Sequence, residues 1–150
     1  MSMFSAFNIN ASGLTAQRYR MDVISENVAN ANTTRTADGT PYRRKVVTFT
    51  EKGGQTSFSR ILGKAAYSHG YTGKGVKVDG VYKDYKTEMN MVYDPSHPDA
   101  DENGYVTYPN VNIITEMTNL IDASRAYEAN STAFNASKKI AQQGLELGRG

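Results

Sequence analysis

The sequence has 150 residues, of which 17 are basic and 15 acidic, and this formal charge of +2 is too small for a dedicated nucleic-acid-binding protein. It contains no cysteine, which excludes a disulfide framework, a thiolate metal site and a cysteine nucleophile. No apolar run approaches the roughly 20 residues that span a bilayer. The first ten residues also lack the basic start and apolar stretch of a cleaved signal peptide, so we expect neither a membrane span nor such a peptide.

The first 32 residues contain no proline and repeat an apolar side chain every seven positions. The repeat consists of Phe7, Leu14, Met21 and Val28. This spacing places the four side chains on one face of a helix. The sequence therefore predicts a helix over residues 1–32.

The middle of the chain has a different composition, because residues 33–112 hold all four prolines, nine of the thirteen glycines and eight of the ten tyrosines. Alternating side chains predict three strands there, at residues 42–50, around Val76 and Val78, and from Met89 to Tyr93. So few aliphatic side chains make a small core at best. The middle is therefore expected to be small, β-rich and loop-rich.

Proline is absent again after residue 112, and the spacing of seven returns. It is carried by Ile113, Leu120, Tyr127, Phe134 and Ala141. A strict seven-residue period favours a left-handed coiled coil over an ordinary surface helix. Asn110 and Asn112, which follow Pro109, are candidate N-terminal caps for this second helix.

Each end of the chain has one narrow apolar stripe and no partner within its own segment. We therefore expect an α+β fold in which long N- and C-terminal helices pack as an antiparallel coiled coil, with the small β-rich segment between them. The predicted domains are a discontinuous helical core of residues 1–33 and 111–150, and a β-rich connector of residues 34–110.

The segment from Asp94 to Gly104 is the most obvious candidate for a metal site. Its alternating polar side chains match the first half of an EF-hand loop at Asp99, Asp101, Asn103 and Gly104. The match ends at Asn110, where an EF-hand requires a bidentate glutamate, so calcium binding is disfavoured. A site of His97 with Asp94 and Asp99 is no better supported, because the flanking prolines hold the segment extended.

Other chemistry is weakly indicated. No serine in a strand–turn–helix elbow accompanies a base and an acid around an apolar pocket, so we expect no enzyme. Arg35, Arg43, Arg44 and Lys45 form a basic cluster. It has two interpretations: a phosphate-binding strand, or an edge strand that its charges protect from pairing with other chains.

Several runs resemble one known family. The run NVANANTT at residues 27–34, with SGLTAQ at 12–17, is similar to the N-terminal signature of the flagellar axial proteins, the family of rod and hook proteins. YDPSHPDADENGYV at 93–106 and YPNVN at 108–112 resemble a basal-body rod protein of that family, and SRAYEAN at 124–130 resembles its C-terminal signature. Residues 50–88 carry little of this resemblance.

The resemblance implies a structural subunit of the bacterial flagellar basal-body rod, in its proximal part, without a cofactor. Proteins of this family are exported unfolded through the flagellar type III apparatus without a cleaved signal peptide. Their terminal helices form the inner coiled-coil layer of a hollow tube that crosses the periplasm and transmits motor torque. The implied partners are other copies of the chain, other proximal and distal rod proteins, the membrane-ring end of the rod and, during secretion, the export apparatus.

Two sets of candidate residues follow. The expected subunit-packing residues are Leu14, Met21, Val28, Leu120, Tyr127 and Phe134. The expected junction and connector residues are Asn27, Asn30, Asp94, Pro95, His97, Pro98 and Asp99. The amides of Asn27 and Asn30 could satisfy free carbonyls where the first helix meets the loop, or could belong to an ordinary polar helix end. The alternative function is a free-standing small binding module, or a divalent-metal-binding protein that uses the Asp94–Gly104 loop.

Overall fold

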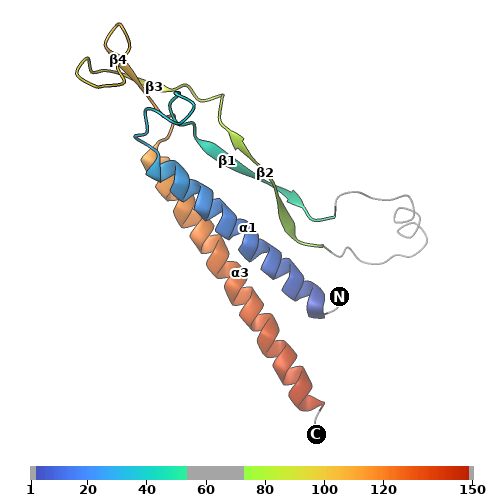
Figure 1. Ribbon diagram of the computed structural model, residues 1–150. Helices are drawn as coiled ribbons and strands as arrows, with labels where there is room; N and C mark the ends of the chain where they lie inside the picture. Colours follow the sequence, from blue (N-terminus) through green and yellow to red (C-terminus); the bar gives the residue numbers. More distant parts are fainter. Residues whose placement is uncertain (1–2, 54–72, 149–150) are drawn as a thin grey trace, which may run out of the picture. The chain divides into compact units, whose positions relative to one another are not determined.

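The computed structural model describes residues 3–53 and 73–148 of the chain, without the side chains of residues 3 and 4 (Figure 1). Its elements are α1 (Met3–Ala29), β1 (Lys45–Glu51), β2 (Val76–Lys83), β3 (Asn90–Tyr93), β4 (Tyr105–Tyr108) and α3 (Ile113–Leu147). Long helices and small sheets together confirm the α+β class that the sequence predicts.

Both predicted helices are present, and side chains cap their ends. α1 ends at Ala29, where the Asn30 side chain donates to the carbonyl of Glu26 at 2.9 Å. α3 begins after Asn112, whose Oδ1 accepts from the N–H of Thr115 at 3.1 Å. Asn112 is therefore the N-cap, whereas Asn110, the other candidate cap, bonds elsewhere as described below.

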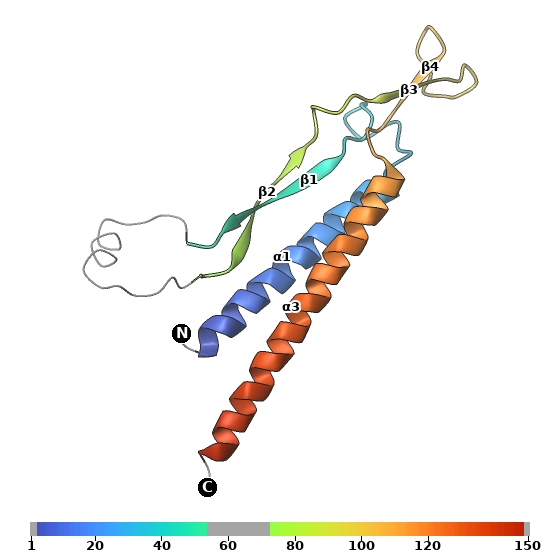
Figure 2. The ribbon, with the colours of Figure 1, turned by 180° about the vertical axis from the view of Figure 1, so that it is seen from behind.

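The strands form two separate two-stranded sheets, β1 with β2 and β3 with β4 (Figure 2). The Arg44 carbonyl accepts from the N–H of Asp84, and the Lys52 N–H donates to the Gly75 carbonyl, both at 2.8 Å, so β1 and β2 run antiparallel. β3 and β4 are also antiparallel, with Asn90 opposite Tyr108. The sequence did not predict β4, whose four residues lie within the stretch read as a connector.

The chain divides into two units, each of which contains parts of both helices. The first, the terminal unit, consists of Met1–Arg18, Phe49–Asp79 and Arg125–Gly150. In it the rings of Phe7 and Phe134 meet edge to face at 5.1 Å, and the hydroxyl of Ser12 accepts from the N–H of Val76 at 3.1 Å. The predicted division into a helical core and a β-rich connector stays a prediction.

The second, the junction unit, consists of Tyr19–Thr48 and Gly80–Ser124. Among the described residues, its buried aliphatic side chains are few: Val23, Ile24, Ala31, Val106 and Ala123, with the rings of Tyr42 and Pro109. Within the part of the chain that the structure describes, neither helix has a stretch long and apolar enough to cross a membrane.

Candidate functional site

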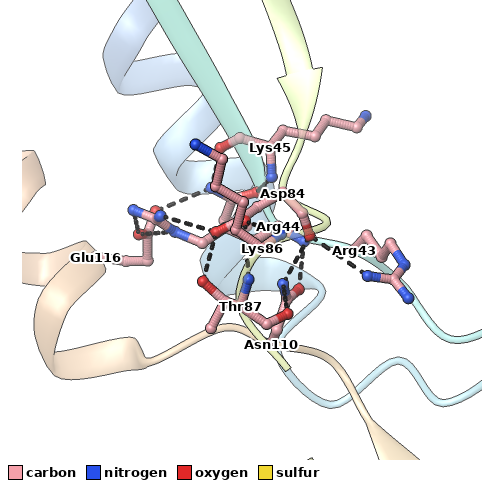
Figure 3. A network of polar contacts seen from close by, with 9 residues as sticks. Arg43, Arg44, Lys45, Asp84, Lys86, Thr87, Asn110 and Glu116 are labelled. Carbon is pink, nitrogen blue, oxygen red and sulfur yellow. Dashed lines mark hydrogen bonds and ion pairs between the residues drawn. The ribbon is translucent and has the colours of Figure 1, made fainter. Parts of the chain in front are cut away.

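The junction unit buries polar side chains where a small core would normally bury apolar ones. Asn27 and Glu116 are 0% and 1% exposed, and with Val106 they are the largest fully buried side chains of the described residues. Both belong to a polar network at the end of α1, the start of β1, the end of β2 and the start of α3. Figure 3 shows the part of it around Arg44, Asp84, Asn110 and Glu116. We call this network the polar junction; it consists of Asn27, Tyr42, Arg44, Lys45, Asp84, Asn110 and Glu116.

Asn27 uses its whole side-chain amide. Its Nδ2 donates to the carbonyl of Lys45 at 2.8 Å and to Glu116 Oε2 at 2.9 Å. Its Oδ1 accepts from the N–H of Lys45 at 2.8 Å and from the hydroxyl of Tyr42 at 2.9 Å. The amide thus binds both backbone groups of Lys45 as a neighbouring strand would, and it joins the end of α1 to β1 and to α3.

Glu116 is a buried carboxylate with a cation beside it. Its Oε1 accepts from Arg44 Nε and Nη2, each at 2.8 Å, while Oε2 accepts from Asn27. A buried charge is tolerated when it is paired and fully hydrogen-bonded, and Glu116 meets both conditions. Arg44 also lies 3.6 Å from Asp84 Oδ2, so one guanidinium joins the residue before β1 to α3 and to the residue after β2.

Asn110 makes the same kind of contact as Asn27 from the other side of the network. Its Oδ1 accepts from the N–H of Arg44 at 2.9 Å, and its Nδ2 donates to the carbonyls of Asp84 and Thr87 at 2.9 and 3.1 Å (Figure 3). Hydrogen bonds from the Thr87 side chain and backbone hold the pKa of Asp84 below its usual range, and the N–H of Lys86 and the Arg44 charge add to this. Asp84 therefore stays ionised beside Arg44.

Tyr42, unlike Asp84, must stay protonated, because its hydroxyl donates to Asn27. Burial raises the pKa of Tyr42 from 10.0 to about 12, and the negative charges of Glu26 and Glu116 add to this. The hydroxyl is therefore neutral over the physiological range and remains available as a donor.

The structure places the two predicted junction asparagines differently. Asn27 lies at the centre of the polar junction and binds the backbone of β1 in addition to α3. Asn30 is half-buried, and it binds the Glu26 carbonyl at the end of its own helix while its Oδ1 accepts from the Thr33 hydroxyl at 3.1 Å. Tyr42, Arg44, Asn110 and Glu116 are absent from the sequence-based candidates, although Arg44 lies in the basic cluster and Asn110 was considered as a cap.

The predicted connector residues form a self-bonded turn. Asp94 Oδ1 accepts from the N–H and hydroxyl of Ser96 at 3.1 and 2.6 Å, and these bonds hold the pKa of Asp94 below its usual range. His97 Nδ1 accepts from the N–H of Asp99 at 3.1 Å, and both prolines of the segment, Pro95 and Pro98, are exposed.

Asp99 links this turn to the loop after α1. Its carboxylate accepts from the hydroxyl of Thr34 at 2.8 Å and lies 3.6 Å from Arg35. Across residues 3–53 and 73–148, no group of three or more histidine and acidic side chains could hold a metal ion. The metal-binding alternative therefore has no support in this segment.

The basic cluster is engaged within the chain. Arg35 pairs with Asp99, Arg44 with Glu116, and Lys45 with Glu26. The guanidinium of the fourth cation, Arg43, lies 4.7 Å from the ring centre of Tyr85. These contacts favour a role of the cluster in the chain's own packing.

The six predicted packing residues are all half-buried, so the contacts within one chain cover these side chains only in part. A second apolar stripe on α3 is far more exposed: Ile114 is 78% exposed, Met117 54% and Ile121 53%. The spacing of three and four residues puts these three side chains on one face of the helix. We call this the exposed α3 face.

Comparison with known proteins identifies the family. The family described as "Flagella basal body rod protein" matches residues 7–35, and that described as "Flagellar basal body rod FlgEFG protein C-terminal" matches residues 102–147. The flagellar basal-body rod protein FlgC of Bacillus subtilis is 46% identical and that of Borreliella burgdorferi 44%, over 99% and 100% of this chain and the full length of each relative. The FlgC protein of Salmonella typhimurium is 37% identical over 99% of this chain and all of its own length.

The chain belongs to the FlgC family of flagellar basal-body rod proteins. It is therefore a structural rod subunit, which confirms the function that the family resemblance implied. The two matched segments contain the two ends of the central hydrogen bond, Asn27 in the first and Glu116 in the second. Three of the seven residues of the polar junction, Asn27, Asn110 and Glu116, lie in the matched segments, and the other four lie between them.

Proposed function

We propose that this FlgC-family subunit polymerises through its terminal helices into a helical tube that transmits motor torque across the periplasm. The exposed α3 face is the observation that carries the proposal. Ile114, Met117 and Ile121 are more than half exposed, and Glu116, the one charged side chain between residues 112 and 121, is buried. A helix face that is apolar, uncharged and uncovered is typical of a surface that another molecule covers.

We propose that α1 and α3 pack as an antiparallel coiled coil and form, with the residues next to them, a helical core of residues 1–33 and 111–150 beside a connector of residues 34–110. The seven-residue repeats support this packing. In the junction unit, Asn27 near the end of α1 bonds to Glu116 near the start of α3. In the terminal unit, Phe7 near the start of α1 contacts Phe134 in the second half of α3.

The segment from Asp94 to Gly104 is proposed to fix how the chain enters α3. Asp94, His97 and Asp99 are each hydrogen-bonded within the turn or to the loop after α1. Pro95 and Pro98 restrict the backbone between them. A segment restricted in this way suits a part that carries mechanical load.

The proposed partners are other copies of the chain, the other proximal and distal rod proteins, and the membrane-ring end of the rod. Contacts between two different surfaces on successive subunits generate an open helix when the rotation between subunits does not close into a ring. We also propose export into the periplasm through the flagellar type III apparatus, without cleavage of the chain. A chain without cysteine forms no disulfides in an oxidising compartment, which is compatible with this route.

The assembly proposal is tested by expressing variants of this chain in a bacterium whose own FlgC gene has been deleted. Leu120→Asp and Phe134→Asp place a charge in the half-buried stripe, and Ile114→Asp places one on the exposed α3 face. All three are expected to abolish motility and incorporation into purified basal bodies, because a buried unpaired carboxylate is costly. Thr115→Asp, at an exposed polar position away from the face formed by Ile114, Met117 and Ile121, is the matched control and is expected to assemble normally.

Three measurements separate the parts of this proposal. Immunoblots of the periplasmic fraction show whether each variant is exported, and quantification of basal bodies shows whether it assembles. The intact mass of the chain from basal bodies shows whether a segment has been removed. Normal assembly of Leu120→Asp, Phe134→Asp and Ile114→Asp would contradict polymerisation through these helices.

A further inference from the structure

The apolar stripes of the two helices do not by themselves define one alignment. In the junction unit, Met21 and Val28 on α1 and Leu120 on α3 are half-buried and belong to seven-residue repeats. Sliding one helix by seven residues, about 10 Å along its axis, again brings apolar side chains opposite apolar ones. Burial of apolar area therefore favours several alignments almost equally.

The buried polar pair has no such repeat. Seven residues before Asn27 is Arg20, and seven residues after Glu116 is Ala123. A shift by seven residues would replace the carboxylate opposite Asn27 by a methyl group and would separate Glu116 from Arg44. Because Asn27 and Glu116 are almost fully buried, unpaired polar atoms there strongly disfavour the shifted alignment.

Arg44 supplies a fixed reference for this pair. Its N–H donates to Asn110 Oδ1 at 2.9 Å, and its carbonyl accepts from the N–H of Asp84 at 2.8 Å. Its guanidinium then reaches Glu116 with two contacts of 2.8 Å. The position of Glu116, and with it the start of α3, is therefore set by a backbone segment that is itself hydrogen-bonded on both sides.

We propose that Asn27, Arg44 and Glu116 are positioning residues that select one alignment of α1 against α3. Single buried polar groups fix register in coiled coils at some cost in stability. One alignment in every copy would place the exposed α3 face at the same height, which repeated contacts along a helical assembly require. The inference rests on the proposed packing of the two helices in the rod subunit.

Distance measurement between two spin labels tests this directly. The chain has no cysteine, so Ser25→Cys on α1 and Asp122→Cys on α3, both exposed positions, give two unique sites for nitroxide labels on the full-length chain. Pulsed electron paramagnetic resonance then reports the distribution of label distances. With the junction intact, we expect one narrow distribution.

The decisive variant replaces the three polar side chains by apolar ones of similar size, N27L/R44M/E116M. Apolar replacement of the buried Arg44–Glu116 ion pair is often neutral or stabilising, whereas the Tyr42 hydroxyl and the backbone of Lys45 lose their hydrogen bonds to Asn27. Its Tm should therefore fall, but by less than that of Asn27→Ala, which also leaves Glu116 buried and unpaired. Its distance distribution should nevertheless gain a second population, which corresponds to a shift of α1 against α3 by about 10 Å along the helix axis. A role limited to stability would change Tm and leave the distance distribution as it was.

Two single variants serve as controls. Glu116→Gln removes the charge that pairs with Arg44, so it should lower Tm. Because it keeps an oxygen acceptor in a side chain of the same size, it should retain one distance. Glu128→Gln, at an exposed position on α3, should change neither. A single unchanged distance in the triple variant, loss of its helical circular dichroism, or several distances with the junction intact would each overturn the inference. Because the isolated chain is used, the result is independent of whether Leu120→Asp blocks rod assembly.

Discussion

Replacing Asn27 by alanine removes an amide that makes four hydrogen bonds, and the cost is calculable from its partners. The Tyr42 hydroxyl and Glu116 Oε2 are buried, where an unpaired polar group costs about 1–3 kcal/mol. The N–H and carbonyl of Lys45 belong to a half-buried residue that water reaches in part, so each loses about 0.5 kcal/mol. With about 1.5 kcal/mol for each buried group, Asn27→Ala should lower the free energy of unfolding by about 4 kcal/mol.

Asn30→Ala is the matched control, since it removes the same amide at the end of the same helix. Asn30 is half-buried and makes two hydrogen bonds, to the Glu26 carbonyl and the Thr33 hydroxyl. Its loss should cost about 1 kcal/mol, because water replaces both partners. Urea unfolding followed by far-ultraviolet circular dichroism measures both values. The reasoning is refuted if the two variants differ by less than about 1 kcal/mol.

Three further predictions use the same unfolding assay. Burial raises the pKa of Tyr42 from 10.0 to about 12, so its neutral hydroxyl stabilises the fold fully below pH 10. That contribution, at most about 3 kcal/mol, is lost as the pH rises through about 12, and Tyr42→Phe should remove this part of the pH dependence. Gly75→Ala should cost about 2–3 kcal/mol, because φ is +91° and a Cβ would lie 2.1 Å from Ser12 Oγ, whereas Gly39→Ala, at φ +74° in open space, should cost about 1 kcal/mol. Asn112→Ala removes the N-cap of α3 and should cost about 1 kcal/mol.

The long helices were predictable because their signals are local. Absence of proline and a seven-residue repeat are visible within one segment, and the N-cap Asn112 precedes its helix directly. Of the paired strands β3 and β4, the sequence predicted only β3, whose side chains alternate clearly. β4 has only four residues, and its pairing with β3 defines it as a strand, whereas its own sequence pattern does not.

The polar junction was not predictable in the same way, because its contacts join distant residues. Asn27 and Glu116 are 89 residues apart, and Arg44 and Glu116 are 72 apart. Charge also misleads a pattern analysis, since a glutamate on an amphipathic helix is normally assigned to the solvent face. Glu116 instead shares the covered side of α3 with Leu120 and Ala123, at helical spacings of four and three.

The start of α3 is therefore inverted relative to an ordinary surface helix, with Glu116 buried on one face and Ile114 exposed on another. The buried face is completed within the chain and the exposed one is not, so damage to the two should have different consequences. Asn27→Ala should reduce incorporation into rods because it lowers the stability of the subunit. Ile114→Asp should block incorporation. It should change the free energy of unfolding of the isolated chain by no more than about 0.5 kcal/mol, as is usual for an exposed site. A large loss of stability in Ile114→Asp would mean that the exposed α3 face is covered within the chain, and that the contact between subunits lies elsewhere.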